Sequence, residues 1–503
     1  MRINVLEYLE SSVGSVPGKV AYTDGAASLT FRQTSDMAKS VGTFLCLQGY
    51  RKEPIAICMK KRPETVAAFF GVLYSGCCYL PFDEDIPKHR IEMILQSVRP
   101  KAAICDEYAR EYLKGMDYPC KIYDFDEISL TPSDDGLLAA IRDKAIDTDP
   151  IYIVFTSGST GTPKGVAACH RSVIDYIEAL SETLGFSRDT IFGNQAPLYG
   201  DACLKELYPT IKFGATTYLI PKNLFMFPLK LIDYLNEHKV NTICWVVSAL
   251  TMISSFGALE KKVPEHLRLI AFAGEVFPIP QLNKWRSALP GVRFINLYGP
   301  TETTGVACYY EIDRDFPPDQ PLPIGRPFRN TEILLIGDDG REAEKGKPGE
   351  ICIRGTSLTL GYWGDPVRTG ESFVQNPLNG AYPELIYKTG DIGKLNESGE
   401  LMFISRKDHQ IKHMGHRIEL GEIEAVSGKF QGVRNVCCVY DDEKKKIVLF
   451  YSGEPTSAEF AVYLRSMLPR YMVPHMISKI DEMPLNSSGK ADRKALKSLA
   501  AEQ

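Results

Sequence analysis

Residues 156–165 read TSGSTGTPKG and directly follow the apolar run IYIVF at 151–155. Glycines let a backbone turn tightly and present its N–H groups to an anion. The Ser and Thr hydroxyls add donors, and Lys164 adds a point charge. The loop therefore predicts a polyphosphate site. It is not a Walker loop, because Pro163 precedes the lysine and Gly165 follows it.

Four further stretches follow this loop in a fixed order along the chain. They are NLYGPTETT (296–304), YKTGD (387–391), SRKDHQIKHMGHRIELGEIE (405–424) and PLNSSGKADRKAL (484–496). Together with the loop they resemble the motifs of the adenylate-forming superfamily, which includes acyl-CoA synthetases, firefly luciferase and the amino-acid adenylation domains of nonribosomal peptide synthetases. Through NQAPLYGDACLKELYPT (194–210) the chain most resembles stand-alone D-alanine–carrier protein ligases and amino-acid adenylation domains.

This resemblance implies a set of ATP-binding residues. One group would hold the β- and γ-phosphates: Thr156, Ser157, Ser159, Thr160 and Lys164. A second group would hold the adenosine: Asn296 on the polar edge of adenine, Tyr298 stacked on its ring, Asp391 on both ribose hydroxyls, and Arg406 also on the ribose.

The resemblance also implies the catalytic residues of a reaction in two halves. A carboxylate attacks the α-phosphorus of ATP, and a thiol then displaces AMP from the acyl-adenylate. Lys490 would bridge the carboxylate and the α-phosphate, Thr301 would bond the α-phosphate, and Glu302 would help hold Mg²⁺. Asp408 would be the hinge about which a small C-terminal domain turns between the two halves.

The substrate is expected to be an amino acid, because Asp201 matches the aspartate with which such enzymes bind the substrate ammonium. Lys205 stands where relatives usually place an apolar residue, which suggests an acidic side chain such as that of glutamate or aspartate. Asp201 and Lys205 are also spaced i, i+4 and could pair with each other, so a small neutral amino acid stays open. Ala273 stands where D-alanine ligases typically have cysteine, which puts D-alanine in doubt.

The thiol acceptor is expected to be the phosphopantetheine arm of a separate carrier protein, since no G-x-D-S-L-type carrier sequence is present. Coenzyme A carries the same arm, so an acyl- or aminoacyl-CoA synthetase is the enzymatic alternative. A nucleotide-binding sensor with a degenerate site is the non-enzymatic one. A kinase is disfavoured, because neither a Walker loop nor HRD and DFG motifs occur.

The elements that position these motifs predict an α/β fold. Apolar strand-like runs alternate with helical patterns, as in PIAICM (54–59), PETVAAFFGVLYSGC (63–77) and KAAICD (101–106). After about residue 320 strand–turn units follow, and a small α+β tail ends the chain. We expect a large N-terminal domain of layered α/β subdomains and a β-rich subdomain over residues 1–407, and a mobile α+β domain over residues 408–503.

Length and charge narrow the function class. The 503 residues are too many for one core. The net charge of −5 argues against a nucleic-acid partner, and no signal peptide or membrane span is expected. Thirteen cysteines without metal spacing suggest reduced thiols in the cytoplasm.

Overall fold

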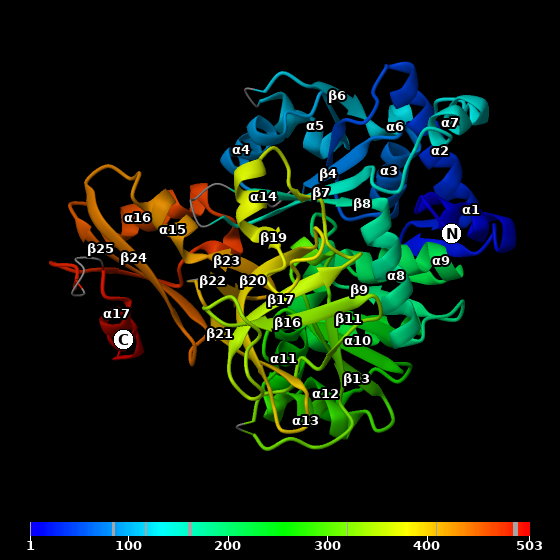
Figure 1. Ribbon diagram of the computed structural model, residues 1–503. Coiled ribbons are helices and arrows are strands. Elements are labelled where there is room, and N and C mark those ends of the chain that lie inside the picture. The colour runs from blue at the N-terminus through cyan, green and yellow to red at the C-terminus, as the bar shows by residue number, and fades with distance from the viewer. Residues whose placement is uncertain are drawn as a thin grey trace. The chain divides into compact units, whose positions relative to one another are not determined.

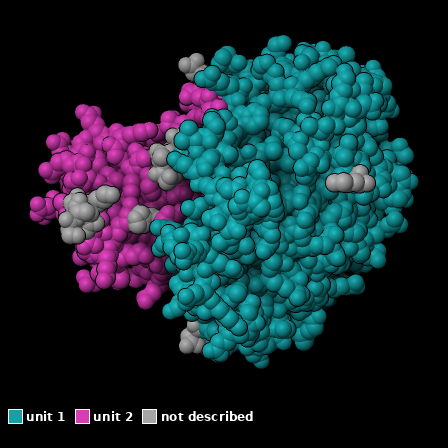
Figure 2. Space-filling model, in the orientation of Figure 1, with its two compact units in different colours: residues 1–84, 98–154, 165–407 teal, residues 85–97, 155–164, 408–503 magenta. Residues whose placement is uncertain are grey.

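The computed structural model describes residues 2–82, 86–115, 118–158, 163–318, 320–408, 410–485 and 491–502. The chain divides into two compact units, which Figure 2 colours teal and magenta. Unit 1 holds residues 1–84, 98–154 and 165–407, and unit 2 holds residues 85–97, 155–164 and 408–503. The last passage from unit 1 to unit 2 therefore lies between Lys407 and Asp408.

A seven-stranded sheet in the described chain carries the predicted phosphate loop (Figure 1). Its β3 pairs in parallel with β4 and β5, and β5 with β6. All residues of β3 and β4 are buried, as expected for apolar strands covered on both faces. In spatial order the strands are β18 (Gly361–Tyr362), β8 (Lys164–Cys169), β7 (Pro150–Thr156), β4 (Cys78–Phe82), β3 (Pro54–Cys58), β5 (Ala102–Cys105) and β6 (Lys121–Asp124).

A nine-stranded sheet carries the other predicted motifs of the first 310 residues. Its β11, β12 and β13 are parallel neighbours, so their carboxyl ends lie side by side. Ligands of such sheets bind outside those ends. The spatial order is β15 (Arg326–Pro327), β14 (Cys308–Glu311), β13 (Arg293–Tyr298), β12 (Leu269–Ala273), β11 (Thr242–Val246), β9 (Ile191–Asn194), β10 (Thr216–Leu219), β1 (Val20–Thr23) and β2 (Ser28–Thr30).

Helix α3 (Pro63–Tyr74) joins the cores of these two sheets, since it contacts β1 and β2 of one and β3 and β4 of the other. Every residue of α3 except Glu64 is buried, which explains why its sequence is apolar on nearly every side. It packs closely on α2 (Phe31–Leu47), where a Cβ on Gly71 would lie 2.6 Å from the Cβ of Val41. Only glycine permits that approach.

The remaining helices of unit 1 surround the sheets. They are α1 (Leu6–Ser15), α5 (Glu107–Lys114), α6 (Phe125–Ile128), α7 (Asp135–Arg142), α8 (His170–Leu184), α9 (Leu204–Phe213), α10 (Pro228–Glu237), α11 (Val247–Ser255), α12 (Ala258–Lys261), α13 (Ile279–Ala288) and α14 (Pro366–Ser372). Their ends follow local rules: Thr30 closes a capping box at the start of α2, and Gly185 ends α8 with φ of 76°.

The β-rich part of unit 1 follows residue 320, as predicted. Its sheet has the order β16 (Thr331–Ile336), β17 (Gly349–Gly355), β20 (Leu385–Leu395) and β19 (Phe373–Gln375), and β21 (Leu401–Arg406) also pairs with β20. The β20–β21 pairing sets Asp391 directly opposite Arg406.

Unit 2 has its own small core. Strands β24 (Val433–Asp441), β25 (Lys446–Gly453) and β26 (Met476–Lys479) form a sheet, and β22 (Gln410–His413) pairs with β23 (His416–Glu419). Its helices are α4 (Lys88–Val98), α15 (Leu420–Ser427), α16 (Ser457–Met467) and α17 (Arg493–Glu502). One face of the sheet packs on α15 and α16, and the other packs on α17.

One strand was not anticipated. The sequence pattern predicts a loop over residues 156–165, whereas β8 occupies residues 164–169 before α8 begins at His170. The strand β8 lies between β7 and β18 in the sheet, so pairing with these neighbours decides its structure. No helix within the described ranges is both long and apolar enough to cross a bilayer.

Candidate active site

Asp391 of β20 is the centre of a buried polar cluster. It is 3% exposed, and its Oδ2 accepts a hydrogen bond of 2.6 Å from the Tyr298 hydroxyl. Its Oδ1 forms an ion pair with Arg406, which also donates 3.2 Å to the Thr389 carbonyl. Burial and the neighbouring carboxylate raise the pKa of Tyr298 well above its usual value. The structure thus joins three of the residues predicted to bind adenosine.

Asn296 lies two residues before Tyr298 on β13, so both side chains are on one face of the strand. Asn296 is 8% exposed, and its amide nitrogen donates 2.8 Å to the Pro323 carbonyl. This contact holds the side chain in one orientation.

A tight turn follows β13 and carries Thr301 and Glu302 in the short helix η3 (Thr301–Thr303). The turn folds back so closely that a Cβ on Gly299 would lie 2.3 Å from the Cα of Val306. Glu302 has no exposed surface, and its Oε1 accepts 2.7 Å from the Tyr362 hydroxyl. Both predicted catalytic residues of this motif are therefore held at the carboxyl end of the nine-stranded sheet.

Asp201 lies next to this turn. It begins the short helix η1 (Asp201–Cys203), is half-buried, and has the Thr301 side chain near enough to lower its pKa. A Cβ on Gly305, whose φ is 101°, would lie 3.7 Å from Asp201 Oδ2. Burial raises the pKa of Asp201, and the charge of Lys205 and the Thr301 hydrogen bond partly offset that effect. The carboxylate of Asp201 therefore lies beside Gly305 in the turn that carries Glu302.

Lys205 lies in α9 and is only 6% exposed. No described residue forms an ion pair or a hydrogen bond with its ammonium group. The pairing with Asp201 that the i, i+4 spacing allowed is therefore not formed. The helix changes type between the two residues, from η1 to α9, and the i, i+4 geometry holds only within a continuous α-helix.

The residue after it, Glu206, is completely buried. Its Oε2 accepts 3.1 Å from the Asn194 amide, while its Oε1 and the Asn194 carbonyl oxygen have no hydrogen-bond partner in the described structure. Burial raises the pKa of Glu206 to about 7, although the charge of Lys205 opposes the shift. Near neutral pH this carboxyl is therefore only partly ionised, and it neutralises Lys205 incompletely. The sequence did not indicate Glu206, because its raised pKa results from burial and no sequence motif reports burial.

Ala273 ends β12 between Val246 and Leu297, as expected for a residue at the carboxyl end of the sheet. Thr156 ends β7, and its hydroxyl is buried without a hydrogen-bond partner among the described residues. Lys164 begins β8. Ser159, Thr160 and Lys490, which were predicted to hold phosphates or to act in catalysis, lie outside the described residues.

Ser157 has partners within unit 2. Its hydroxyl donates 2.6 Å to the Arg417 carbonyl and accepts 3.1 Å from the Glu419 N–H. The next residue, Gly158, donates its N–H to Glu422 at 3.3 Å, and Glu422 forms a buried ion pair with Arg90. In this structure a carboxylate thus accepts a hydrogen bond from one N–H of the predicted phosphate loop.

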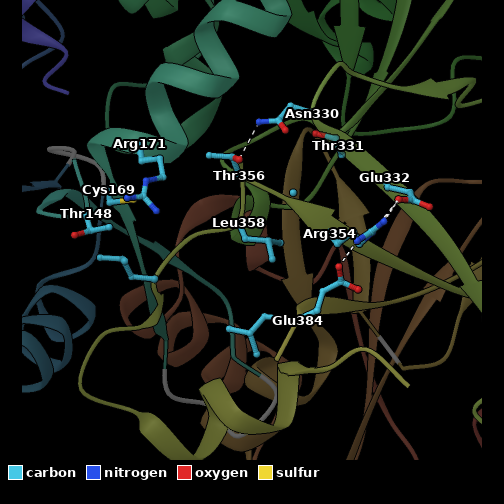
Figure 3. Close-up of a pocket in the computed structure, with 13 residues that line it drawn as sticks. Thr148, Cys169, Arg171, Asn330, Thr331, Glu332, Arg354, Thr356, Leu358 and Glu384 are labelled. Atoms are coloured by element: carbon cyan, nitrogen blue, oxygen red, sulfur yellow. Dashed lines mark hydrogen bonds and ion pairs between the residues drawn. The ribbon is translucent and has the colours of Figure 1, made fainter. Parts of the chain in front are cut away.

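Figure 3 shows a surface cavity of about 610 Å³ in unit 1 that none of the predicted site residues lines. Two of its arginines already have acidic partners: Arg171 pairs with Asp147 at 2.7 Å, and Arg354 pairs with both Glu332 and Glu384. The cavity therefore offers no unpaired guanidinium to a ligand.

Comparison with known proteins identifies the site's family. Residues 9–363 match the family model described as AMP-binding enzyme, which is more than half of the chain. The chain belongs to the AMP-binding enzyme family. This membership agrees with the adenylate-forming superfamily that the ordered motifs predicted.

Curated relatives of this AMP-binding enzyme are much longer proteins. Tyrocidine synthase 1 of Brevibacillus parabrevis is 30% identical over 502 residues, which cover 98% of this chain and 45% of that protein. Bacitracin synthase 1 of Bacillus licheniformis is 31% identical over 496 residues, covering 97% of this chain and 9% of that protein. The chain thus spans less than half the length of either relative.

Solved structures confirm the predicted fold. The adenylation domain AlmE of Vibrio cholerae, in complex with glycyl-adenosine-5′-phosphate, matches with a TM-score of 0.85 at 22% identity, over 100% of this chain and 98% of that one. An artificially fused adenylation–PCP di-domain from Klebsiella oxytoca matches with a TM-score of 0.82 at 19% identity, over 94% and 93%. The fold is that of an adenylation domain with a large N-terminal and a small C-terminal domain.

Proposed function

We propose that this AMP-binding enzyme adenylates an amino acid with an acidic side chain and transfers the aminoacyl group to the phosphopantetheine thiol of a carrier protein. The observation that carries the substrate class is the buried ammonium of Lys205, which has no ion-pair partner among the described residues. A charged group in such a place is costly unless a ligand supplies the opposite charge.

Two separate charges would then recognise the substrate. Asp201, beside Gly305, accepts the α-ammonium in a charge-assisted hydrogen bond. Lys205 receives the side-chain carboxylate. Glu206 does not replace that carboxylate, because burial lets it keep its proton to a pH of about 7.

The nucleotide would lie across the ends of β13 and β20. Asp391 accepts from the ribose hydroxyls and is oriented by Tyr298 and Arg406, which hold one carboxylate oxygen each. Tyr298 offers its ring to adenine, and Asn296 offers its amide to the polar edge. The loop from Thr156 to Lys164 holds the terminal phosphates.

The chemistry has two balanced steps. A substrate carboxylate oxygen attacks the α-phosphorus, and the bond from that phosphorus to the bridging oxygen breaks, so pyrophosphate leaves. The carrier thiol then gives up its proton and attacks the acyl carbon, and AMP leaves with the electron pair of the acyl–oxygen bond. Thr301 donates to the α-phosphate, and Lys490 neutralises the two anions as they approach. Between the two steps the small C-terminal domain rotates about the hinge at Asp408.

Magnesium suits the residues present. Mg²⁺ prefers oxygen ligands and usually takes one or two carboxylates together with substrate phosphates. Glu302 supplies a completely buried carboxylate, and no group of three or more His, Cys, Asp or Glu in the described chain forms a metal site of its own. When bound, the ion would neutralise phosphate charge.

The test is substrate-dependent pyrophosphate release with L-Glu, L-Asp, L-Ala, D-Ala and glycine. Release that is at least tenfold faster with an acidic amino acid supports the proposal, and preference for D-Ala would make the chain a D-alanine–carrier protein ligase instead. Aminoacyl transfer is then measured with a holo-carrier protein and with coenzyme A, since preference for coenzyme A would indicate a CoA synthetase. If no amino acid causes pyrophosphate release, the result would favour the alternative of a nucleotide-binding sensor with a degenerate site.

A further inference from the structure

Tyr362 holds the carboxylate of Glu302 from a distant part of the chain. Its hydroxyl donates 2.7 Å to Glu302 Oε1, and it is 6% exposed where Glu302 has no exposure. Its ring meets Phe373 edge-on, with centroids 6.2 Å apart, and its strand β18 pairs with β8. The donor is therefore fixed by packing on one side and by strand pairing on the other.

The loop before Tyr362 is also tied to the turn that carries Glu302. The Thr359 N–H donates 3.0 Å to the Glu302 carbonyl, and the Thr304 hydroxyl donates 2.7 Å to the Ser357 carbonyl. The side-chain hydroxyls of Ser357 and Thr359 are buried and have no hydrogen-bond partner in the described structure. Buried hydroxyls without partners are expected where a ligand or ordered water completes the site.

We propose that Tyr362 is the positioning residue that orients Glu302 toward the metal ion of the bound nucleotide, with Ser357 and Thr359 beside it as partners for metal-bound water. The inference rests on the proposed function. A carboxylate oxygen held by a phenol cannot rotate freely, so the direction of the other oxygen is set before the nucleotide arrives. Outer partners of this kind typically change metal affinity about 10–100-fold when they are removed.

The experiment measures Mn²⁺ binding by electron paramagnetic resonance in the presence of α,β-methylene-ATP, whose bridge cannot be cleaved in adenylation. Tyr362→Phe keeps the ring and removes only the hydroxyl. We expect its Mn²⁺ affinity to fall about tenfold or more, while its affinity for the analogue in EDTA stays within about twofold of wild type. The matched control is Tyr8→Phe, because Tyr8 is 1% exposed and donates 2.5 Å to the Glu178 carboxylate in a part of the molecule without predicted site residues.

Each outcome decides something. Wild-type Mn²⁺ affinity in a folded Tyr362→Phe protein would overturn the positioning role. Failure of the wild-type protein to bind Mn²⁺ with the analogue would instead count against the proposed nucleotide site. Equal losses in both phenylalanine variants would also overturn the inference, because they would indicate a general effect. If Tyr362→Phe does not fold, Tyr362→His is measured: its shorter donor should also weaken Mn²⁺, and unchanged affinity would refute the proposal.

Discussion

Replacing Lys205 with methionine should remove the preference for acidic amino acids. The side chain keeps a similar length and apolar body but loses its charge. At a separation of about 4 Å and an effective dielectric constant near 20, the ammonium and a substrate carboxylate attract by about 4 kcal/mol. After desolvation, hydrogen bonds to charged groups contribute about 1.5–3 kcal/mol. The ratio of kcat/KM for L-Glu over L-Ala should therefore fall about 10–150-fold.

The assay is pyrophosphate release with both amino acids at saturating ATP. The matched control is Lys212→Met on the same helix, where the lysine is also largely buried but is paired with Glu178 at 2.7 Å. This variant should leave the L-Glu/L-Ala ratio within about twofold of wild type, since Lys212 lies outside the predicted substrate residues.

Stability separates two explanations of a specificity change. Methionine at position 205 removes a buried charge that has no described partner, so the free energy of unfolding should stay equal or rise. If Lys205 instead paired with Asp201 in solution, its loss would leave a buried carboxylate alone and cost about 3–5 kcal/mol. An unchanged L-Glu/L-Ala ratio in a folded Lys205→Met enzyme would refute the acidic-substrate reasoning outright.

Three further predictions concern buried charged groups. The pKa of Glu206 is about 7 in the folded protein and 4.5 in the unfolded chain, so the free energy of unfolding should fall as pH rises between these values, by at most about 3 kcal/mol. Glu206→Gln should reduce this pH dependence in urea unfolding at pH 5 and pH 8, and a pH dependence equal to that of wild type would contradict the prediction. Asp391→Asn should raise the KM for ATP about 10–150-fold with the amino-acid KM nearly constant, and equal rises in both would argue against a ribose contact. Arg90→Met should cost about 3–5 kcal/mol because the buried Glu422 loses its positively charged partner, and Arg90→Met/Glu422→Leu should recover most of it; strictly additive losses in urea unfolding would disprove the coupling.

Local motifs allowed much of the fold to be predicted. Apolar runs such as residues 54–59 and 101–106 became β3 and β5 within one or two residues, because continuous burial on both faces demands apolar side chains whatever the tertiary detail. The strand β8 was not predicted because its residues KGVAAC have weak strand preference, and they gain their structure by pairing between β7 and β18. One of its two neighbours, β18, is almost 200 residues further along the chain, and no local pattern points to it.

The site divides in the same way. The sequence motifs contain Tyr298, Glu302 and Asp391, so each of these residues could be predicted. The hydrogen bond between Tyr298 and Asp391 could not, because the two residues lie on strands of different sheets. Tyr362 could not be found, because nothing in the spacing from Glu302 distinguishes a phenol that orients a carboxylate from one that fills a core.

The spacing of residues in the sequence was least informative about which charged groups neutralise one another. The i, i+4 spacing allowed Asp201 and Lys205 to pair with each other, and such a pair would have left neither charge for a substrate. The helix type changes from η1 to α9 between them, and no ion pair joins the two groups, although the charge of Lys205 still lowers the pKa of Asp201. Glu206 could restore neutrality only when ionised, and burial opposes that ionisation. In the proposed function Asp201 and Lys205 complement a molecule with an ammonium at one end and a carboxylate at the other, and this proposal depends on helix type and burial rather than on residue identity alone.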